Sequence, residues 1–127
     1  MHELSVCLAL VQQLQAIARE QGAETIDRVV LNIGPLSGIE PELLRNAYPL
    51  AAAGTPANGA ELIIHSADVV VRCDTCGASS IVAVNRLLCG ACGDFRTRLV
   101  SGDEMELQRV ELRRPQASSD AARPSFA

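Results

Sequence analysis

Two Cys-x-x-Cys pairs constrain this chain more than any other feature. Cys73 and Cys76 form the first pair, Cys89 and Cys92 form the second, and twelve residues separate them. The two thiolates of each pair can reach one metal ion, and the glycine after each pair permits a tight turn. Four thiolates form a closed tetrahedral shell, which suits Zn(II) and leaves no position for a substrate. The spacing therefore predicts a structural zinc site.

The charge and composition of the chain argue against several classes of protein. Its 127 residues carry a net charge of −4 without a basic run, which disfavours binding to nucleic acid or to a membrane surface. No apolar run approaches the roughly 20 residues that span a bilayer. The segment Leu4–Ala18 lacks the positive leader of a secretory signal and contains three glutamines, so we expect a cytoplasmic protein. With two histidines and no nucleophile motif, the sequence does not indicate an enzyme.

Other uses of the cysteines remain open at this point. An iron site like that of rubredoxin has similar pairs, but Phe95 is the only aromatic residue near them. A thioredoxin-type redox pair needs one Cys-x-x-Cys and leaves the second unexplained. Disulfides are rare in the cytoplasm. We therefore expect zinc, and we expect the fifth cysteine, Cys7, to be buried in the apolar face of a helix.

The apolar pattern predicts an α+β fold with a small three-stranded sheet covered by two helices. A three-and-four spacing indicates the helices, and β-branched runs indicate the strands. Pro49 should kink the second helix or end it early, and the last strand slips its alternation by one residue, as a β-bulge would cause. In order, the elements are a helix over Leu4–Gln21, a strand over Thr25–Ile33, a helix that opens at Ile39–Glu42, a strand over Glu61–Arg72, and a strand through Met105, Leu107, Val110 and Leu112.

The cysteine pairs lie between the second and third of these strands, so they form a zinc-ribbon-like module of four cysteines inserted into the sheet domain. We expect an α/β domain of residues 1–68 plus 101–113 and a zinc-binding module of residues 69–100. The final residues, 114–127, are rich in Ser, Ala and Pro without periodicity, which is typical of a disordered tail.

The amino end, Met1-His2-Glu3, is a candidate site for a second metal. A free terminal amine, the backbone amide of His2 and its imidazole can close small chelate rings around one ion. Nitrogen donors in a planar arrangement favour Ni(II) or Cu(II), because Zn(II) has no geometric preference from d-electrons. A histidine in second place also arises by chance, so the amino end needs support from the rest of the chain.

That support comes from a resemblance that runs from Met1 to about Leu112. The chain resembles the HypA/HybF family of hydrogenase maturation nickel metallochaperones. The combination of segments is more specific than either cysteine pair alone. The segments that carry it are Met1–Ser5, Asn32–Glu42, Gly59–Leu62, the two cysteine pairs and Leu99–Glu104.

The resemblance implies that the chain binds one Ni(II) ion as cargo and delivers it to the large subunit of a [NiFe] hydrogenase together with the GTPase HypB. It implies that His2 is the indispensable nickel ligand and that the Met1 amine and the amides of His2 and Glu3 complete the site. The Glu3 carboxylate could instead contact a partner protein. Cys73, Cys76, Cys89 and Cys92 match the family's structural zinc ligands.

The chain departs from some relatives in having no histidines beside its cysteine pairs, so a coupling of the zinc site to pH through histidine is not expected. A monomer and a homodimer both remain open. Two rival functions also remain: a zinc-stabilised adaptor that binds partners without nickel, and a nucleic-acid-binding zinc ribbon, which should show clustered basic residues.

Overall fold

The computed structural model of the protein describes residues 2–115, with His2 described by its backbone only. Met1, the side chain of His2 and residues 116–127 lie outside the described part. The predicted disordered tail, residues 114–127, therefore falls outside it except for Arg114 and Pro115. Within the described part, no helix is long and apolar enough to cross a membrane.

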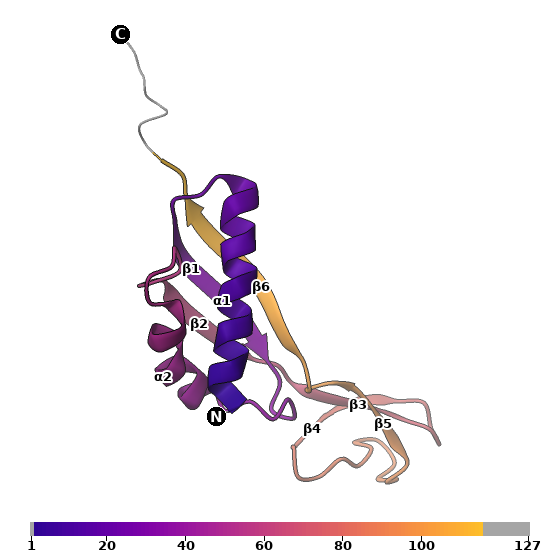
Figure 1. Ribbon diagram of the computed structural model, residues 1–127. Coiled ribbons are helices and arrows are strands. Elements are labelled where there is room, and N and C mark those ends of the chain that lie inside the picture. Colours follow the sequence, from indigo (N-terminus) through magenta and orange to yellow (C-terminus); the bar gives the residue numbers. More distant parts are fainter. Residues whose placement is uncertain (1, 116–127) are drawn as a thin grey trace.

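Two helices and two three-stranded sheets make up the fold (Figure 1). The first sheet has the strand order β2-β1-β6, and both helices cover one of its faces. The second sheet has the order β4-β3-β5 and projects from one end of the first. The elements are α1 (His2–Gln21), β1 (Thr25–Ile33), α2 (Pro41–Ala52), β2 (Glu61–Ser66), β3 (Val69–Cys73), β4 (Ser79–Val82), β5 (Thr97–Ser101) and β6 (Met105–Arg113). The predicted α+β class is confirmed.

The core lies between the helices and the covered face of the first sheet. Alternate residues of β1, namely Val29, Leu31 and Ile33, are buried beneath α1 and α2. Cys7 belongs to this core as expected, and its thiol donates a hydrogen bond to the Leu44 carbonyl at 3.3 Å. Burial of the Cys7 thiol raises its pKa, and the nearby carboxylate of Glu3 raises it further.

The predicted bulge in the last strand is present. β6 runs antiparallel to β1, with Val30 opposite Arg109 and Leu31 opposite Leu107, so Gln108 is the extra residue. The bulge returns the side chains on both sides of it to the covered face, since Leu107 and Val110 both pack on the core. The slip in the alternation of apolar residues therefore predicted the β-bulge correctly.

The single strand predicted over Glu61–Arg72 is wrong, because this segment forms two strands in different sheets. β2 pairs with β1 in parallel, and its last backbone contact is the hydrogen bond from the Ala67 amide to the Ile33 carbonyl. The chain then leaves the first sheet, and β3 pairs with β4 and β5. Both halves favour a strand, whereas Ser66, Ala67 and Asp68 between them are poor strand formers. These three residues were a local sign of the break, and the pairing partners show that it is a change of sheet.

The second helix does not end early at Pro49, which was one of the two outcomes expected from the sequence. α2 continues to Ala52. A proline in a helix removes one hydrogen bond to the carbonyl four residues earlier, here that of Arg45. Pro49 lies on the exposed side of the last turn, where water can satisfy that carbonyl. Tyr48 and Ala51 beside it are buried and pack this turn on the core.

The two sheets meet where the backbone at Gly34 lies against the backbone at Gly102. The Gly34 amide donates to the Glu104 carbonyl at 2.8 Å, and the Leu36 amide donates to the Gly102 carbonyl at 2.7 Å. A Cβ atom on Gly34 would overlap the carbonyl oxygen of Gly102 and would lie 2.7 Å from the Asp103 nitrogen. Only glycine fits at this contact.

Gly34→Ala is expected to lower the free energy of unfolding by about 3 kcal/mol or more, because the added methyl overlaps backbone atoms that cannot move aside alone. Gly38→Ala is the control, since Gly38 has a φ of +82° but no atom within 4 Å of an added Cβ. The control should cost only about 1 to 2 kcal/mol for its left-handed backbone. Urea unfolding measures both variants, and equal losses would contradict the close contact.

Candidate metal sites

The four cysteine sulfurs of the second sheet region form one compact cluster. Their Sγ atoms all lie within 4.8 Å of one another, with 3.6 Å between Cys73 and Cys92 and 3.5 Å between Cys76 and Cys89. Four sulfurs at about 2.3 Å from a tetrahedral zinc ion would be roughly 3.8 Å apart. These separations are close to that value and far longer than a disulfide bond of about 2.05 Å. The cluster could therefore bind zinc.

Each Cys-x-x-Cys pair forms a turn whose backbone amides point at its first sulfur. The amides of Thr75 and Cys76 donate to the Cys73 Sγ at 3.3 and 3.4 Å. In the second pair, the amides of Ala91 and Cys92 donate to the Cys89 Sγ, both at 3.3 Å. The glycines that follow the pairs both have φ of +78°, a conformation that favours glycine.

These amides stabilise the thiolate form of the two first cysteines. The amide of Cys76 is the main cause that lowers the pKa of Cys73. The amides of Cys92 and Ala91 lower the pKa of Cys89 to about 6. Because metals bind thiolates rather than thiols, the backbone itself prepares two of the four ligands for a cation.

Asp94 joins the two turns, and sequence reasoning did not identify it. Its carboxylate accepts a hydrogen bond from the Thr75 hydroxyl at 2.5 Å, across nineteen residues, and it also accepts from the amide and guanidinium of Arg96. The Thr75 bond and then the Arg96 bonds hold the pKa of Asp94 well below its usual range. The Asp94 carbonyl accepts from the Cys89 amide at 2.9 Å. A Thr inside the first pair and an Asp just after the second were the available sequence signal.

At the amino end, the structure describes the backbone from His2 and the side chains from Glu3. α1 begins at His2, and the amides in the first turn of a helix have no partner within the helix. Met1 and the His2 imidazole lie outside the described part, so two of the three predicted nickel ligands have no described side-chain geometry. The other histidine, His65, is exposed on β2 opposite Asn32.

The Glu3 side chain is turned inward. It is 8% exposed, and its Oε2 accepts a hydrogen bond from the Glu40 amide at 3.1 Å. Glu40 precedes Pro41, the first residue of α2, so the carboxylate lies at the positive end of the α2 dipole. This bond fastens the first turn of α1 to the start of α2. Sequence reasoning left the role of this carboxylate open, because its partner lies 37 residues away.

Among the described side chains, those of residues 3–115, the four cysteines are the one group of three or more His, Cys, Asp and Glu residues arranged to share a metal ion. They lie in the projecting module, whereas the first turn of α1 lies beside α2 on the covered face of the other sheet (Figure 1). The cysteine cluster and the start of α1 are therefore separate parts of the molecule.

Comparison with known proteins identifies the family. A family model described as "Hydrogenase/urease nickel incorporation, metallochaperone, hypA" matches residues 1–112. The chain belongs to the HypA family. It is 47% identical over 112 residues to hydrogenase maturation factor HypA of Nitrosospira multiformis, which covers 88% of this chain and 97% of the relative. It is 38% identical to the HypA of Aquifex aeolicus over the same shares of both chains.

Two solved HypA structures share the fold. The solution structure of the Ni metallochaperone HypA from Helicobacter pylori matches with a TM-score of 0.66 and 25% identity, over 89% of this chain and 98% of that one. A second solution structure, of a HypA protein, matches with a TM-score of 0.68 and 27% identity, over 88% and 96%. The predicted resemblance is confirmed, and the chain is a member of a family of hydrogenase maturation factors for nickel incorporation.

Asp94→Asn should speed the loss of zinc to a chelator by about tenfold, the low end of the effect of removing a partner next to a metal ligand. The amide keeps an acceptor for Thr75 but loses the charge that holds Arg96. Asp74→Asn is the matched control, because Asp74 lies inside the first pair and its carboxylate bonds only to the exposed guanidinium of Arg98. The rate of zinc release to a chelator is measured for both variants. Equal rates would contradict the role of Asp94 in holding the two Cys-x-x-Cys turns together.

Proposed function

We propose that the protein binds one Ni(II) ion at its amino end and delivers it to the large subunit of a [NiFe] hydrogenase during maturation. The observation that carries the proposal is the match of residues 1–112 to the nickel-incorporation family, beginning with Met1-His2-Glu3. The relatives named as hydrogenase maturation factors support hydrogenase as the recipient. The family description also names urease, which makes urease the second recipient to test.

In this proposal the His2 imidazole, the Met1 amine and the amides of His2 and Glu3 hold the nickel ion. First-turn amides support this arrangement, because no carbonyl within the helix accepts from them. The amine and the imidazole must be unprotonated and the amides must lose their protons to bind, so nickel affinity falls with acidity. A site that needs these deprotonations holds its cargo firmly near neutral pH and gives it up to a partner with better ligands.

The Glu3 carboxylate has a positioning role in this proposal, and Glu3 contributes only its amide to nickel. The carboxylate is buried and accepts from the Glu40 amide, which occupies one of its oxygens. Hydrogen bonds to a charged group are worth about 1.5 to 3 kcal/mol. The bond therefore steadies the backbone that carries the nickel-binding amides.

The four cysteines hold a structural zinc ion in the proposal. The closed set of four sulfurs supports a structural rather than a catalytic metal, since no ligand position remains for a substrate. The two separate sheets support a division into a nickel-binding domain of residues 1–68 plus 101–113 and a zinc-binding module of residues 69–100. Zinc would supply folding energy to a module with few buried residues.

The proposal places the protein in the cytoplasm, as a carrier and not an enzyme. A HypB-type GTPase and the hydrogenase large subunit are its proposed partners. Exposed apolar side chains near the amino end, Leu4 and Leu8 on α1 and Leu43 on α2, offer surface for such a partner next to the cargo. The proposal is compatible with a monomer and with a homodimer.

His2→Ala is expected to abolish nickel loading while zinc content stays at one ion per chain. An extension of two residues before Met1 should have the same effect, because it moves the free amine away from His2. His65→Ala is the control, since it removes the other histidine from an exposed position on β2 and should leave nickel affinity unchanged. Calorimetry and metal analysis of untagged protein measure all three. Unchanged nickel affinity in His2→Ala would refute the site.

Glu3→Gln tests whether the Glu3 carboxylate positions the first turn of α1 or binds nickel. Glutamine can still accept from the Glu40 amide but carries no charge, so the free energy of unfolding should fall by about 1 kcal/mol. Nickel affinity should stay within about threefold of the wild type, which corresponds to a change of less than about 0.7 kcal/mol in the binding free energy. A loss of nickel as complete as in His2→Ala would make the carboxylate a ligand and would overturn the positioning role.

A further inference from the structure

The sheet of the cysteine module has one covered and one uncovered face. The loop of residues 83–96 lies over the covered face, where the Gly90 amide donates to the Ser80 hydroxyl and the Thr97 hydroxyl donates to the Leu87 carbonyl. Val71, opposite Ser80 and Leu99 in the register, is buried on this face. Side chains alternate along a strand, so the neighbours of Val71 project from the other face.

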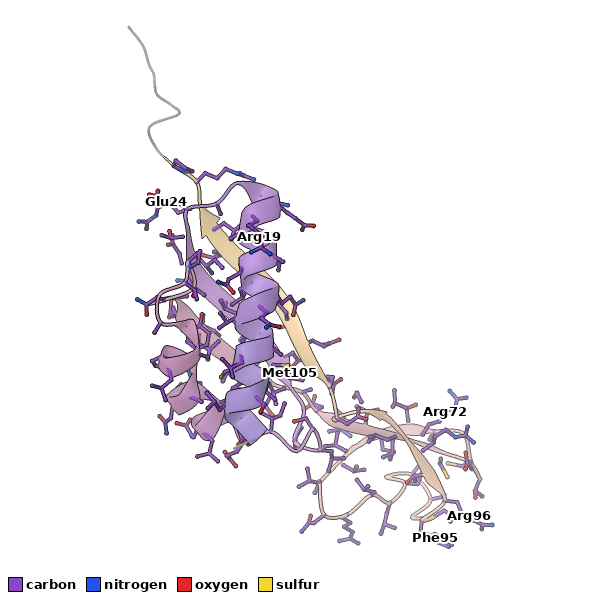
Figure 2. The ribbon with its side chains drawn as sticks, viewed as in Figure 1. Arg19, Glu24, Arg72, Phe95, Arg96 and Met105 are labelled. Carbon is purple, nitrogen blue, oxygen red and sulfur yellow. The ribbon has the colours of Figure 1, made fainter. Side chains whose placement is uncertain are left out.

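The uncovered face combines apolar and basic side chains. Val70 lies opposite Ile81 on β4, and Arg72 lies opposite Arg98 on β5. Ile81 is 71% exposed. In Figure 2, Arg72 lies on the side of the module away from Phe95 and Arg96. We call Val70, Arg72, Ile81 and Arg98 the basic-apolar face.

The two arginines of this face are an unfavourable pair within the molecule. Like charges directly opposite on neighbouring strands destabilise a sheet. The Asp74 carboxylate accepts from Arg98 at 3.2 Å, and within residues 2–115 Arg72 has no carboxylate partner. One carboxylate is therefore paired with Arg98, and the charge of Arg72 is not paired. Strand propensity explains an exposed Ile81, but it gives no reason for Arg72 opposite Arg98.

The charge of the module is opposite to that of the rest of the chain. Residues 69–100 contain four arginines and two aspartates, whereas the rest contains seven arginines and thirteen acidic residues. A nucleic-acid partner would meet the acidic remainder, and two arginines on one small face are too few to track a phosphate backbone. Arginine is the side chain best suited to bind carboxylates through two parallel hydrogen bonds.

We propose that the basic-apolar face docks an acidic segment of a partner protein. Carboxylates of that segment pair with Arg72 and Arg98 and relieve their mutual repulsion, and apolar side chains two residues along from those carboxylates cover Val70 and Ile81. The apolar and basic rows lie two residues apart along β3. An extended segment places every second side chain on one side, so apolar and acidic residues at alternate positions of that side match the two rows. This docking does not require nickel, so the test of this proposal is independent of the test of the amino-terminal nickel site.

The experiment is a titration of the full, zinc-loaded chain, labelled with ¹⁵N, with the blocked peptide Glu-Ser-Val-Ser-Glu-Ser-Leu, in which acidic and apolar residues alternate along one side. We expect the amide signals of β3, β4 and β5 to shift and those of α1 and α2 to stay. Arg72→Glu combined with Arg98→Glu should weaken binding by roughly tenfold or more, and 0.5 M salt should weaken the wild type. Ile81→Thr, which keeps a β-branched side chain, should weaken binding while preserving zinc content.

Arg86→Glu is the matched control, because Arg86 is an exposed arginine of the same module outside the basic-apolar face. It should bind the peptide as the wild type does. Equal weakening by Arg86→Glu, equal binding of a peptide with lysines in place of the glutamates, or no binding at all would overturn the proposal. Binding of a single-stranded oligonucleotide at the same residues would also overturn it. Sedimentation that shows a dimer broken by Arg72→Glu would identify a second copy as the occupant and overturn it too.

Discussion

The close contact between Gly34 and Gly102 sets the positions of both candidate metal sites. It holds the end of β1 against the chain between β5 and β6, which is where the cysteine module joins the first sheet. From Gly34 the loop continues to Glu40, whose amide binds the buried carboxylate of Glu3. One backbone contact and one charged hydrogen bond therefore connect the module to the first turn of α1. The sites are far apart in sequence but are built on one continuous set of contacts.

The features that sequence predicted correctly are those with a local pattern. The cysteine pairs have a spacing that reports their shared ligand geometry, and the structure brings their four sulfurs together. The helix periodicity placed Cys7 in the core. The slip between Leu107 and Val110 revealed the bulge, because a period of two cannot skip a residue without one. In each case the physical cause acts over a few neighbouring residues.

The features that sequence missed depend on residues that meet only after folding. Residues 66–68 mark a break in the predicted strand Glu61–Arg72, but the change of sheet there depends on the different partners with which the two halves pair. The bonds from Thr75 to Asp94 and from Glu40 to Glu3 cross 19 and 37 residues. Asp94 and Glu3 are also ordinary acidic residues when read in sequence. Their importance lies in what they contact.

The central claim is that nitrogen donors at the amino end carry nickel while sulfur donors in the module hold zinc. X-ray absorption at the nickel and zinc edges of untagged protein, loaded with one equivalent of each metal, tests both halves of the claim in one sample. The account predicts four sulfurs at about 2.3 Å around zinc and a planar, nitrogen-rich shell without sulfur around nickel. Sulfur neighbours at the nickel edge, or nitrogen in place of sulfur at the zinc edge, would contradict it.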